Sequence, residues 1–217
     1  MYLIHRYGLD GRLVFTLFIL ITFLISFIIQ EFILTSQVIE DYFAEFLSIS
    51  LAFELAELRN KWDWMNYILL PIIFILKFIL ISGWILSGTI LYGYKVSFKS
   101  IYNAVLVSEF VWLIPSIILI IWFGIFNSDY SFTDVQYFKP LSLLNFFKIS
   151  ELDNWLILPL QSINIFQVLY LLVLTFMLKV TLNKGFKETL NFTIPVYLSA
   201  VFSWIFFITF ININFGT

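Results

Sequence analysis

Cysteine is absent from this chain of 217 residues, and histidine occurs once, at position 5. Without cysteine the chain has no disulfide framework, no thiolate metal site and no thiol nucleophile. Because His5 is the single imidazole, a histidine-based catalytic triad and a histidine metal cluster are excluded as well. Charge is also scarce, since Asp, Glu, Lys and Arg make up 12% of the residues, about half of the share in a soluble domain.

Apolar residues are abundant in place of charge: 61% of the chain is hydrophobic and 21% is aromatic. A water-soluble domain of this length cannot bury so much apolar surface in one core. Disorder is excluded too, because disordered segments are poor in aromatic residues and rich in charge. The net charge of −2 argues against nucleic acid as a partner, which requires a basic face. The composition predicts a multi-pass membrane protein in contact with membrane lipid.

Five segments reach the length of about 20 mostly apolar residues that a helix needs to cross a bilayer. They predict an all-α bundle that forms a single transmembrane domain over residues 1–217, with spans at about 13–34, 66–91, 104–126, 158–180 and 191–213.

Two further segments lie between the predicted spans. In residues 38–58, apolar side chains recur at three- and four-residue steps, which predicts an amphipathic helix. This helix either extends the first span beyond the membrane or lies flat on the bundle, and a re-entrant hairpin over 44–58 is a lesser alternative. Residues 137–152 predict a second, shorter interfacial segment.

Basic residues are distributed unevenly over the segments outside the spans. Residues 1–12, 92–103 and 179–190 contain 7 basic and 2 acidic residues, whereas 35–65 and 127–157 contain 4 basic and 10 acidic ones. Cytoplasmic loops carry an excess of Lys and Arg. The N-terminus is therefore predicted in the cytoplasm, and the C-terminus and the interfacial segments on the opposite side.

Lys77 lies near the middle of the second predicted span, where an unpaired charge costs at least about 2.5–3.5 kcal/mol. Glu109 in the third span is the nearest acidic candidate. At 1.5 Å per residue, Lys77 is about 21 Å and Glu109 about 8 Å from the cytoplasmic ends of their predicted helices. Pairing across this difference requires a vertical offset, which a kink at Pro71 or Pro115 can supply. The alternative partner of Lys77 is another chain.

Three amides follow one another at three-residue steps in the fourth predicted span: Gln161, Asn164 and Gln167. This spacing predicts one polar face over nearly two helical turns. Such amides usually form hydrogen bonds between helices, and the alternative is the lining of a polar pathway or of a lipid-headgroup pocket.

Small residues at four-residue spacing allow helix backbones to approach closely. Two such pairs predict helix-packing faces: Gly83 with Ser87, and Ser199 with Ser203.

Catalytic motifs are missing. The sequence contains no G-x-S-x-G, no H-E-x-x-H and no G-x-x-x-x-G-K-[ST]. It has no pair of aspartates at matching depth in two spans, and no span with the repeated arginines of a voltage sensor. The sequence therefore predicts no enzyme, no cofactor and no metal site.

Two stretches resemble the Yip (Ypt-interacting-protein) family, including its bacterial members. In residues 83–115, GWILSGTILYGYKVSFKSIYNAVLVSEFVWLIP, a Gly-containing helix end is followed by a Phe-Lys turn and a span with a central proline. In residues 141–207, a Leu-Asn-Phe entry precedes a helix and a Lys-rich turn. The resemblance covers about residues 65–210 and implies a non-enzymatic helical protein that associates laterally, in the cytoplasmic (inner) membrane of a bacterium.

Three functions follow as hypotheses. The first is a non-catalytic accessory or assembly subunit that docks against another integral membrane protein or against its own copies. The second is a permease or ion-pathway component that uses Lys77, Glu109 and the three amides. The third and weakest is a lipid-modifying membrane enzyme that acts through acidic residues of the non-cytoplasmic loops.

Overall fold

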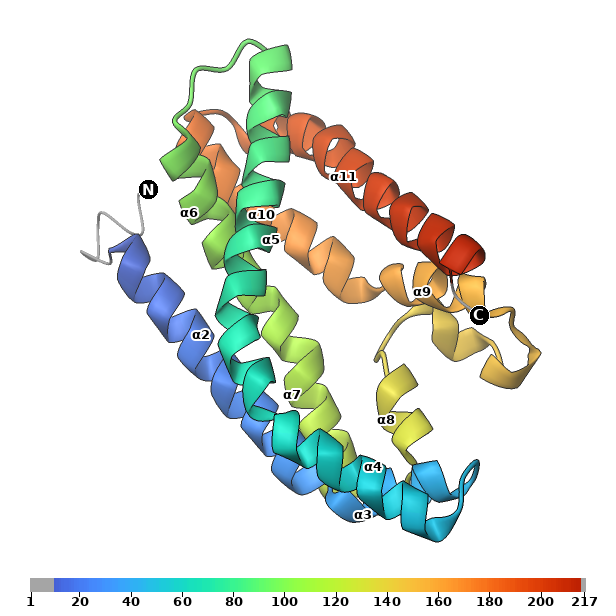
Figure 1. The fold of residues 1–217 in the computed structure, drawn as a ribbon. Coiled ribbons are helices and arrows are strands. Elements are labelled where there is room, and N and C mark those ends of the chain that lie inside the picture. The colour runs from blue at the N-terminus through green and yellow to red at the C-terminus, as the bar shows by residue number, and fades with distance from the viewer. Residues whose placement is uncertain (1–9, 216–217) are drawn as a thin grey trace. The chain divides into compact units, whose positions relative to one another are not determined.

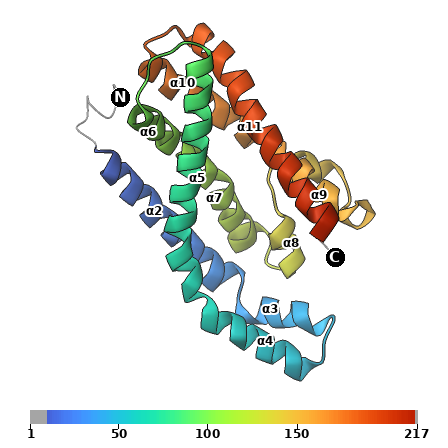
Figure 2. The same cartoon turned by 45° about the horizontal axis from the view of Figure 1, so that its top comes forward.

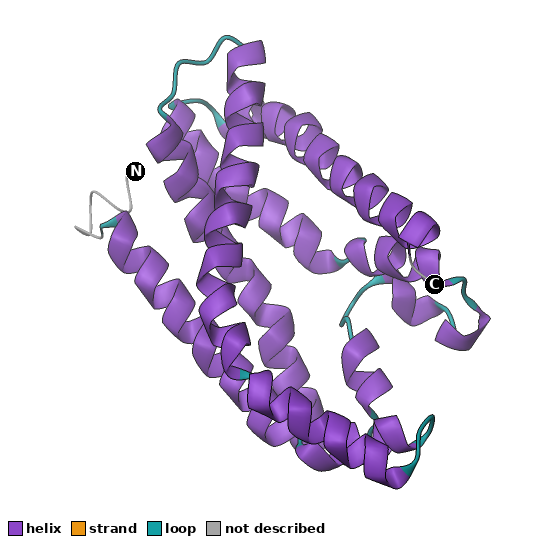
Figure 3. Cartoon of the chain, in the orientation of Figure 1, coloured by secondary structure: helices purple, strands orange, loops and turns teal. Residues whose placement is uncertain are grey.

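The computed structural model describes residues 10–215, so His5 and Arg6 lie outside the described residues. Helices and short helical turns dominate the described part of the chain, and it contains no strand (Figure 3). Within it, five helical segments are long and apolar enough to cross a membrane: 11–33, 64–91, 98–126, 165–182 and 186–214. The chain is therefore an all-α, polytopic integral membrane protein, as its composition predicts.

Two compact units make up the chain. Among the described residues, unit 1 comprises 10–15, 76–112 and 139–215, and unit 2 comprises 16–75 and 113–138. Three of the four boundaries fall inside the first, second and third spans, so each of these spans contributes to both units. The single transmembrane domain expected from the sequence stays a prediction.

Unit 1 is built mainly from the second half of the chain. Its helical elements are the later part of α5 (Trp64–Leu91), α6 (Phe98–Ser108), the 3-10 turns η2 (Glu109–Trp112), η4 (Leu143–Phe146) and η5 (Ile149–Glu151), and α9 (Asn154–Ser162), α10 (Ile165–Leu182) and α11 (Phe186–Phe215). α10 packs against both α6 and α11 (Figure 1), and this packing buries Ile101, Leu106 and Leu178 completely.

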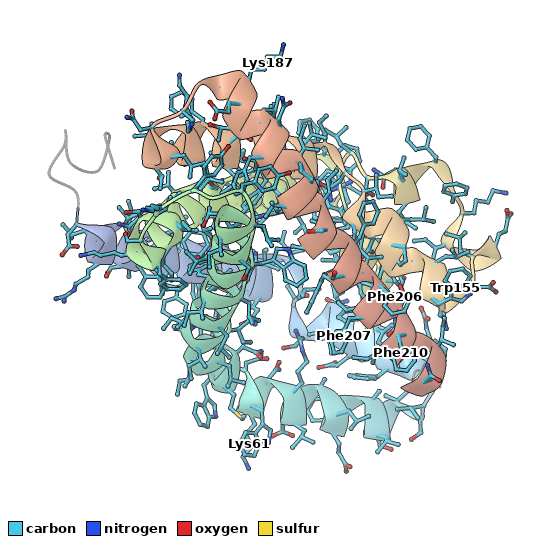
Figure 4. All side chains as sticks on the ribbon, turned by 90° about the horizontal axis from the view of Figure 1, so that it is seen from above. Lys61, Trp155, Lys187, Phe206, Phe207 and Phe210 are labelled. Carbon is cyan, nitrogen blue, oxygen red and sulfur yellow. The ribbon has the colours of Figure 1, made fainter. Side chains whose placement is uncertain are left out.

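α11 has two different ends. Lys187 lies at its start, and Phe206, Phe207 and Phe210 lie towards its other end (Figure 4). These three rings are more than half exposed, as expected for aromatic side chains that face lipid acyl chains.

Unit 2 contains a helical hairpin outside the spans. Its elements are most of α2 (Gly11–Ile28) with the π-helical turn η1 (Ile29–Ile33), α3 (Ser36–Ala44), α4 (Ile49–Trp62), the first turns of α5, α7 (Leu113–Ile121), the π-helical turn η3 (Trp122–Phe126) and α8 (Phe132–Tyr137). Ile33, Phe123 and Val135 form a buried cluster that joins η1, η3 and α8. The Tyr130 hydroxyl donates a hydrogen bond to the Ile33 carbonyl at 3.0 Å.

The prediction of one amphipathic helix over 38–58 is wrong. The chain turns back between Ala44 and Ile49, so that α3 and α4 form a hairpin (Figure 2). The hairpin buries Ile39 and Ala52 almost completely, and the Asn60 amide donates to the Ser36 hydroxyl at its open end. A straight helix would leave these small and apolar surfaces without a partner, and the periodicity of one segment cannot reveal this packing.

The second predicted interfacial segment, 137–152, holds the end of α8 and the turns η4 and η5. Its interfacial location stays a prediction. Pro140 precedes Leu141, whose backbone has a φ of 57°, and a left-handed residue of this kind ends helical structure.

Candidate functional site: a buried ion pair within the spans

An ion pair joins two spans of unit 1. Lys77 Nζ on α5 lies 2.7 Å from Glu109 Oε2, in the turn η2 that follows α6. The Glu109 side chain is fully buried, whereas 38% of the Lys77 side chain is exposed. The carboxylate is therefore shielded from its surroundings by protein, and the ammonium is only partly covered.

The start of α6 explains why these residues meet. The sequence places the third span at about residue 104, but α6 begins at Phe98, after Ser97, whose hydroxyl accepts a hydrogen bond from the Ser100 amide. Glu109 is then about 16 Å, not 8 Å, from the start of its helix, at 1.5 Å per residue. The difference in depth from Lys77 falls to about 5 Å, which the long lysine side chain spans. The early start of α6, and not a kink at Pro71 or Pro115, therefore brings Glu109 to the depth of Lys77.

Aromatic rings surround the ion pair. The Lys77 ammonium lies 5.8 Å from the centre of the Trp112 ring, and Trp112 in turn contacts Tyr170 of α10, with 5.9 Å between ring centres. Tyr170 stacks on Tyr197 of α11 at 5.1 Å. The charges thus connect to α10 and α11 through a chain of rings, and a cation near an aromatic face is stabilised by the ring electrons.

Two buried polar atoms beside the ion pair have no hydrogen-bond partner among the described residues: Glu109 Oε1 and the Tyr170 hydroxyl. Tyr170 lies close enough to Glu109 for the phenol and the carboxylate to interact directly. A buried polar group without a partner costs about 1–3 kcal/mol. The proximity of the two groups therefore lowers this cost.

The predicted polar face of the fourth span does not form, because the helix is broken. α9 ends at Ser162 and α10 begins at Ile165, so Gln161 and Gln167 belong to different helices. Asn164 lies between them in extended conformation and caps α10, since its side-chain oxygen accepts a hydrogen bond from the Gln167 amide at 2.9 Å. Gln167 interacts with Tyr197, the last ring of the chain beside the ion pair.

A short piece of distant chain stabilises this break. The Leu143 amide donates to the Ile163 carbonyl at 2.9 Å, and the Ile165 amide donates to the Leu141 carbonyl at 3.2 Å. These bonds satisfy backbone groups that an unbroken helix would satisfy itself. The helix-capping preference of Asn is a sequence signal for a start at residue 164, whereas the pairing with residues 141–143 has none.

The two predicted packing pairs lie in different environments. The Ser199 hydroxyl on α11 accepts a hydrogen bond from Trp84 Nε1 on α5 at 3.0 Å, while Ser203 is exposed. On α5, a Cβ built at Gly83 meets no other atom within 4 Å, and the Ser87 hydroxyl is exposed and bonds to the Gly83 carbonyl of its own helix.

Gly88 is the glycine that brings α5 and α11 together. A Cβ built there would lie 2.7 Å from both methyl groups of Val196. Within this chain the contact surface of α5 is turned towards Gly88, so the role of Gly83 and Ser87 as a packing face stays a prediction. The spacing of Gly83 and Ser87 revealed a small-residue face but not its direction.

No family model matches this chain, and no curated protein and no solved structure is similar enough to match it. The resemblance to the Yip family consequently stays an expectation from the sequence.

The site offers little chemistry of its own. Over residues 10–215, no three His, Asp or Glu side chains gather as they would around a metal ion. One ammonium, one carboxylate and two phenols can hold charge and accept or donate hydrogen bonds at mid-membrane depth. They can therefore fix helices to one another, or hold a polar group.

Proposed function

We propose that this chain is a non-catalytic accessory subunit that associates laterally with another integral membrane protein. The observation that carries this proposal is one open face of α5. Gly83 and Ser87 are small residues of this face, and a Cβ built at Gly83 meets no other atom within 4 Å. Leu80, on the same face, is 69% exposed.

The partly exposed Lys77 lies at the border of this face. Positions 80, 83 and 87 are three or four residues apart, which places them along one side of a helix, and Lys77 lies three residues before Leu80. Because 38% of the Lys77 side chain is exposed, part of this side chain can contact a neighbour beside α5. The face therefore combines close-packing capacity with an electrostatic handle.

A protein helix suits this face better than lipid does. Lipid tails are as apolar as leucine, so helices in a bilayer associate through close packing and polar contacts. An ammonium at mid-membrane depth is costly against acyl chains, and a polar group of a neighbouring helix reduces that cost. A partner helix can also approach closely over Gly83, where acyl chains gain no comparable fit.

Lateral association can be measured on the full chain after purification in mild detergent. Gly83→Leu places a large side chain on the open face of α5. We expect this variant to be a monomer, where the unaltered chain forms a complex with another protein or with its own copies. Gly124→Leu is the matched control, since Gly124 is an exposed glycine of another span whose Cβ would meet only one atom, at 4.0 Å. A clean monomer of the unaltered chain at every salt concentration would sink the proposal.

The orientation of the chain in the membrane and the kind of membrane belong to the same proposal. The uneven distribution of Lys and Arg supports a cytoplasmic N-terminus and a C-terminus on the opposite side. The resemblance of residues 65–210 to the Yip family supports the inner membrane of a bacterium and a non-enzymatic role. A reporter fused after Thr217 tests the topology, because activity on the cytoplasmic side contradicts it.

A permease or ion-pathway component is the second candidate, favoured by the buried carboxylate. Glu109 Oε1 and the Tyr170 hydroxyl are adjacent, buried and without hydrogen-bond partners in the described chain, and intramembrane carboxylates of this kind occur in proton relays.

Proton uptake into proteoliposomes separates the two candidates. A permease would show uptake above that of protein-free vesicles, and Lys77→Met would abolish it while Lys184→Met, outside the spans, would not. The accessory subunit shows no uptake, and its Lys77→Met variant has weaker association.

A further inference from the structure

α4, outside the spans, has an apolar side that the hairpin does not cover. Four residues spaced by four, three and four positions make up this side, named here the α4 stripe: Leu51, Leu55, Leu58 and Trp62. Such spacing places all four on one helix face. Leu51 is 41% exposed, and Leu58 and Trp62 are each 51% exposed. The packing of α3 therefore leaves the stripe open.

Charged residues occupy another side of the same helix. Glu54, Glu57 and Lys61 are exposed, and their three- and four-residue steps place them on a common face away from the stripe. Lys61 projects from the end of α4 next to α5 (Figure 4). Ile49 and Phe53 are exposed as well, and they lie on a third side of α4, outside the stripe. The stripe and the charged residues therefore occupy separate sides of α4.

The stripe continues the surface that α5 exposes in the membrane. Trp62 stacks on Trp64, the first residue of α5, with ring centres 6.3 Å apart and an angle of 25° between planes. Only Asp63 separates the two helices, and both ribbon views draw α4 turning away from the first turns of α5 (Figures 1 and 2). Tryptophan is enriched at the headgroup level of bilayers, so this pair marks the depth at which α4 begins.

We propose that α4 lies in the headgroup region of the leaflet at which α5 begins, with the α4 stripe in contact with lipid acyl chains. Glu54 and Glu57 then face water. Residues 36–63 contain 6 acidic and 2 basic residues, so anionic headgroups repel the hairpin and electrostatic attraction contributes nothing to its binding. The partner is therefore the apolar edge of a bilayer of neutral lipid, and the burial of the stripe provides the binding free energy.

Spin labels on single cysteines test this placement directly, because the natural chain has no cysteine. The full chain is reconstituted into phosphatidylcholine vesicles with a label at Leu58→Cys or at Glu57→Cys. We expect the label at position 58 to be severalfold more accessible to oxygen than to a water-soluble nickel chelate, and the label at position 57 to show the reverse order. Leu51→Cys provides a second measurement on the stripe, should one variant fold poorly.

Two results would overturn the placement. Equal access of the nickel chelate to positions 57 and 58 means that the hairpin stands in water. Protection of position 58 from both oxygen and nickel means that protein, not lipid, covers the stripe. Neither result bears on the open face of α5 around Gly83, so this test and that of lateral association fail independently.

Discussion

Removal of Lys77 should destabilise the protein far more than removal of Glu109, although both residues form the same ion pair. Lys77→Met leaves the fully buried Glu109 carboxylate without its cation, and Oε1 already lacks a hydrogen bond in the described chain. An uncompensated buried charge of this kind costs about 3–5 kcal/mol of folding free energy.

Glu109→Gln leaves the Lys77 ammonium, instead of the Glu109 carboxylate, without its partner charge. The Lys77 side chain is 38% exposed, so its ammonium can turn to other acceptors on neighbouring helices. The glutamine keeps the shape of the glutamate and a hydrogen-bonding oxygen. The loss should be that of a hydrogen bond to a charged group, about 1.5–3 kcal/mol. The double variant removes both charges, and it should be more stable than Lys77→Met alone.

Unfolding in mild detergent by added dodecyl sulfate, followed through the fluorescence of the 7 tryptophans, measures these differences. Lys184→Met is the matched control, because Lys184 pairs with Glu188 at 2.8 Å through partly exposed side chains outside the spans. Exposed pairs of this kind contribute little, so this control should unfold like the natural chain. The reasoning fails if the single effects of Lys77→Met and Glu109→Gln simply add in the double variant.

Three further changes probe the packing of the chain. Gly88→Leu should lower the free energy of unfolding in detergent by about 1–3 kcal/mol because the site is overpacked. Gly83→Leu, at an open position, should change this free energy little. Equal effects of the two substitutions would contradict the assigned α5 contact surface. Asn164→Ala removes the cap of α10 and should cost about 1 kcal/mol in the same unfolding measurement, and an unchanged stability would mean that the break does not depend on this side chain. Burial raises the pKa of Tyr130 above its ordinary value of 10.0. The stabilising contribution of the protonated phenol is therefore fully present below about pH 10 and is lost as the pH rises through the raised pKa. Tyr130→Phe should abolish this part of the alkaline destabilisation, and it should also cost about 1 kcal/mol because the bond to the Ile33 carbonyl is lost.

The number and type of the spans could be predicted from the sequence alone. Runs of apolar residues as long as a bilayer is thick permit few structures other than helices, because backbone groups in lipid must be satisfied within the segment. The absence of cysteine and the single histidine likewise excluded whole classes of chemistry without any coordinates.

The candidate site was only half predictable. Lys77 and Glu109 stand out because charges within spans are costly, but their pairing depends on α6 starting at Phe98, and the polar loop-side residues 98–103 hide that start from a hydropathy reading. Tyr170 and Tyr197 were missed, since an aromatic residue in a span rich in aromatic residues carries no distinguishing signal.

Only the tertiary structure decided which side of a helix meets its neighbour and where a helix is interrupted. Whether Gly83 or Gly88 meets another helix depends on the rotation of α5, which a four-residue spacing does not specify. The break at Asn164 depends on hydrogen bonds with the 141–143 segment, and the reversal between α3 and α4 depends on the packing of these two helices against each other. Local patterns report the free energy of a segment in its average surroundings, whereas these features arise from the particular surface that each segment meets.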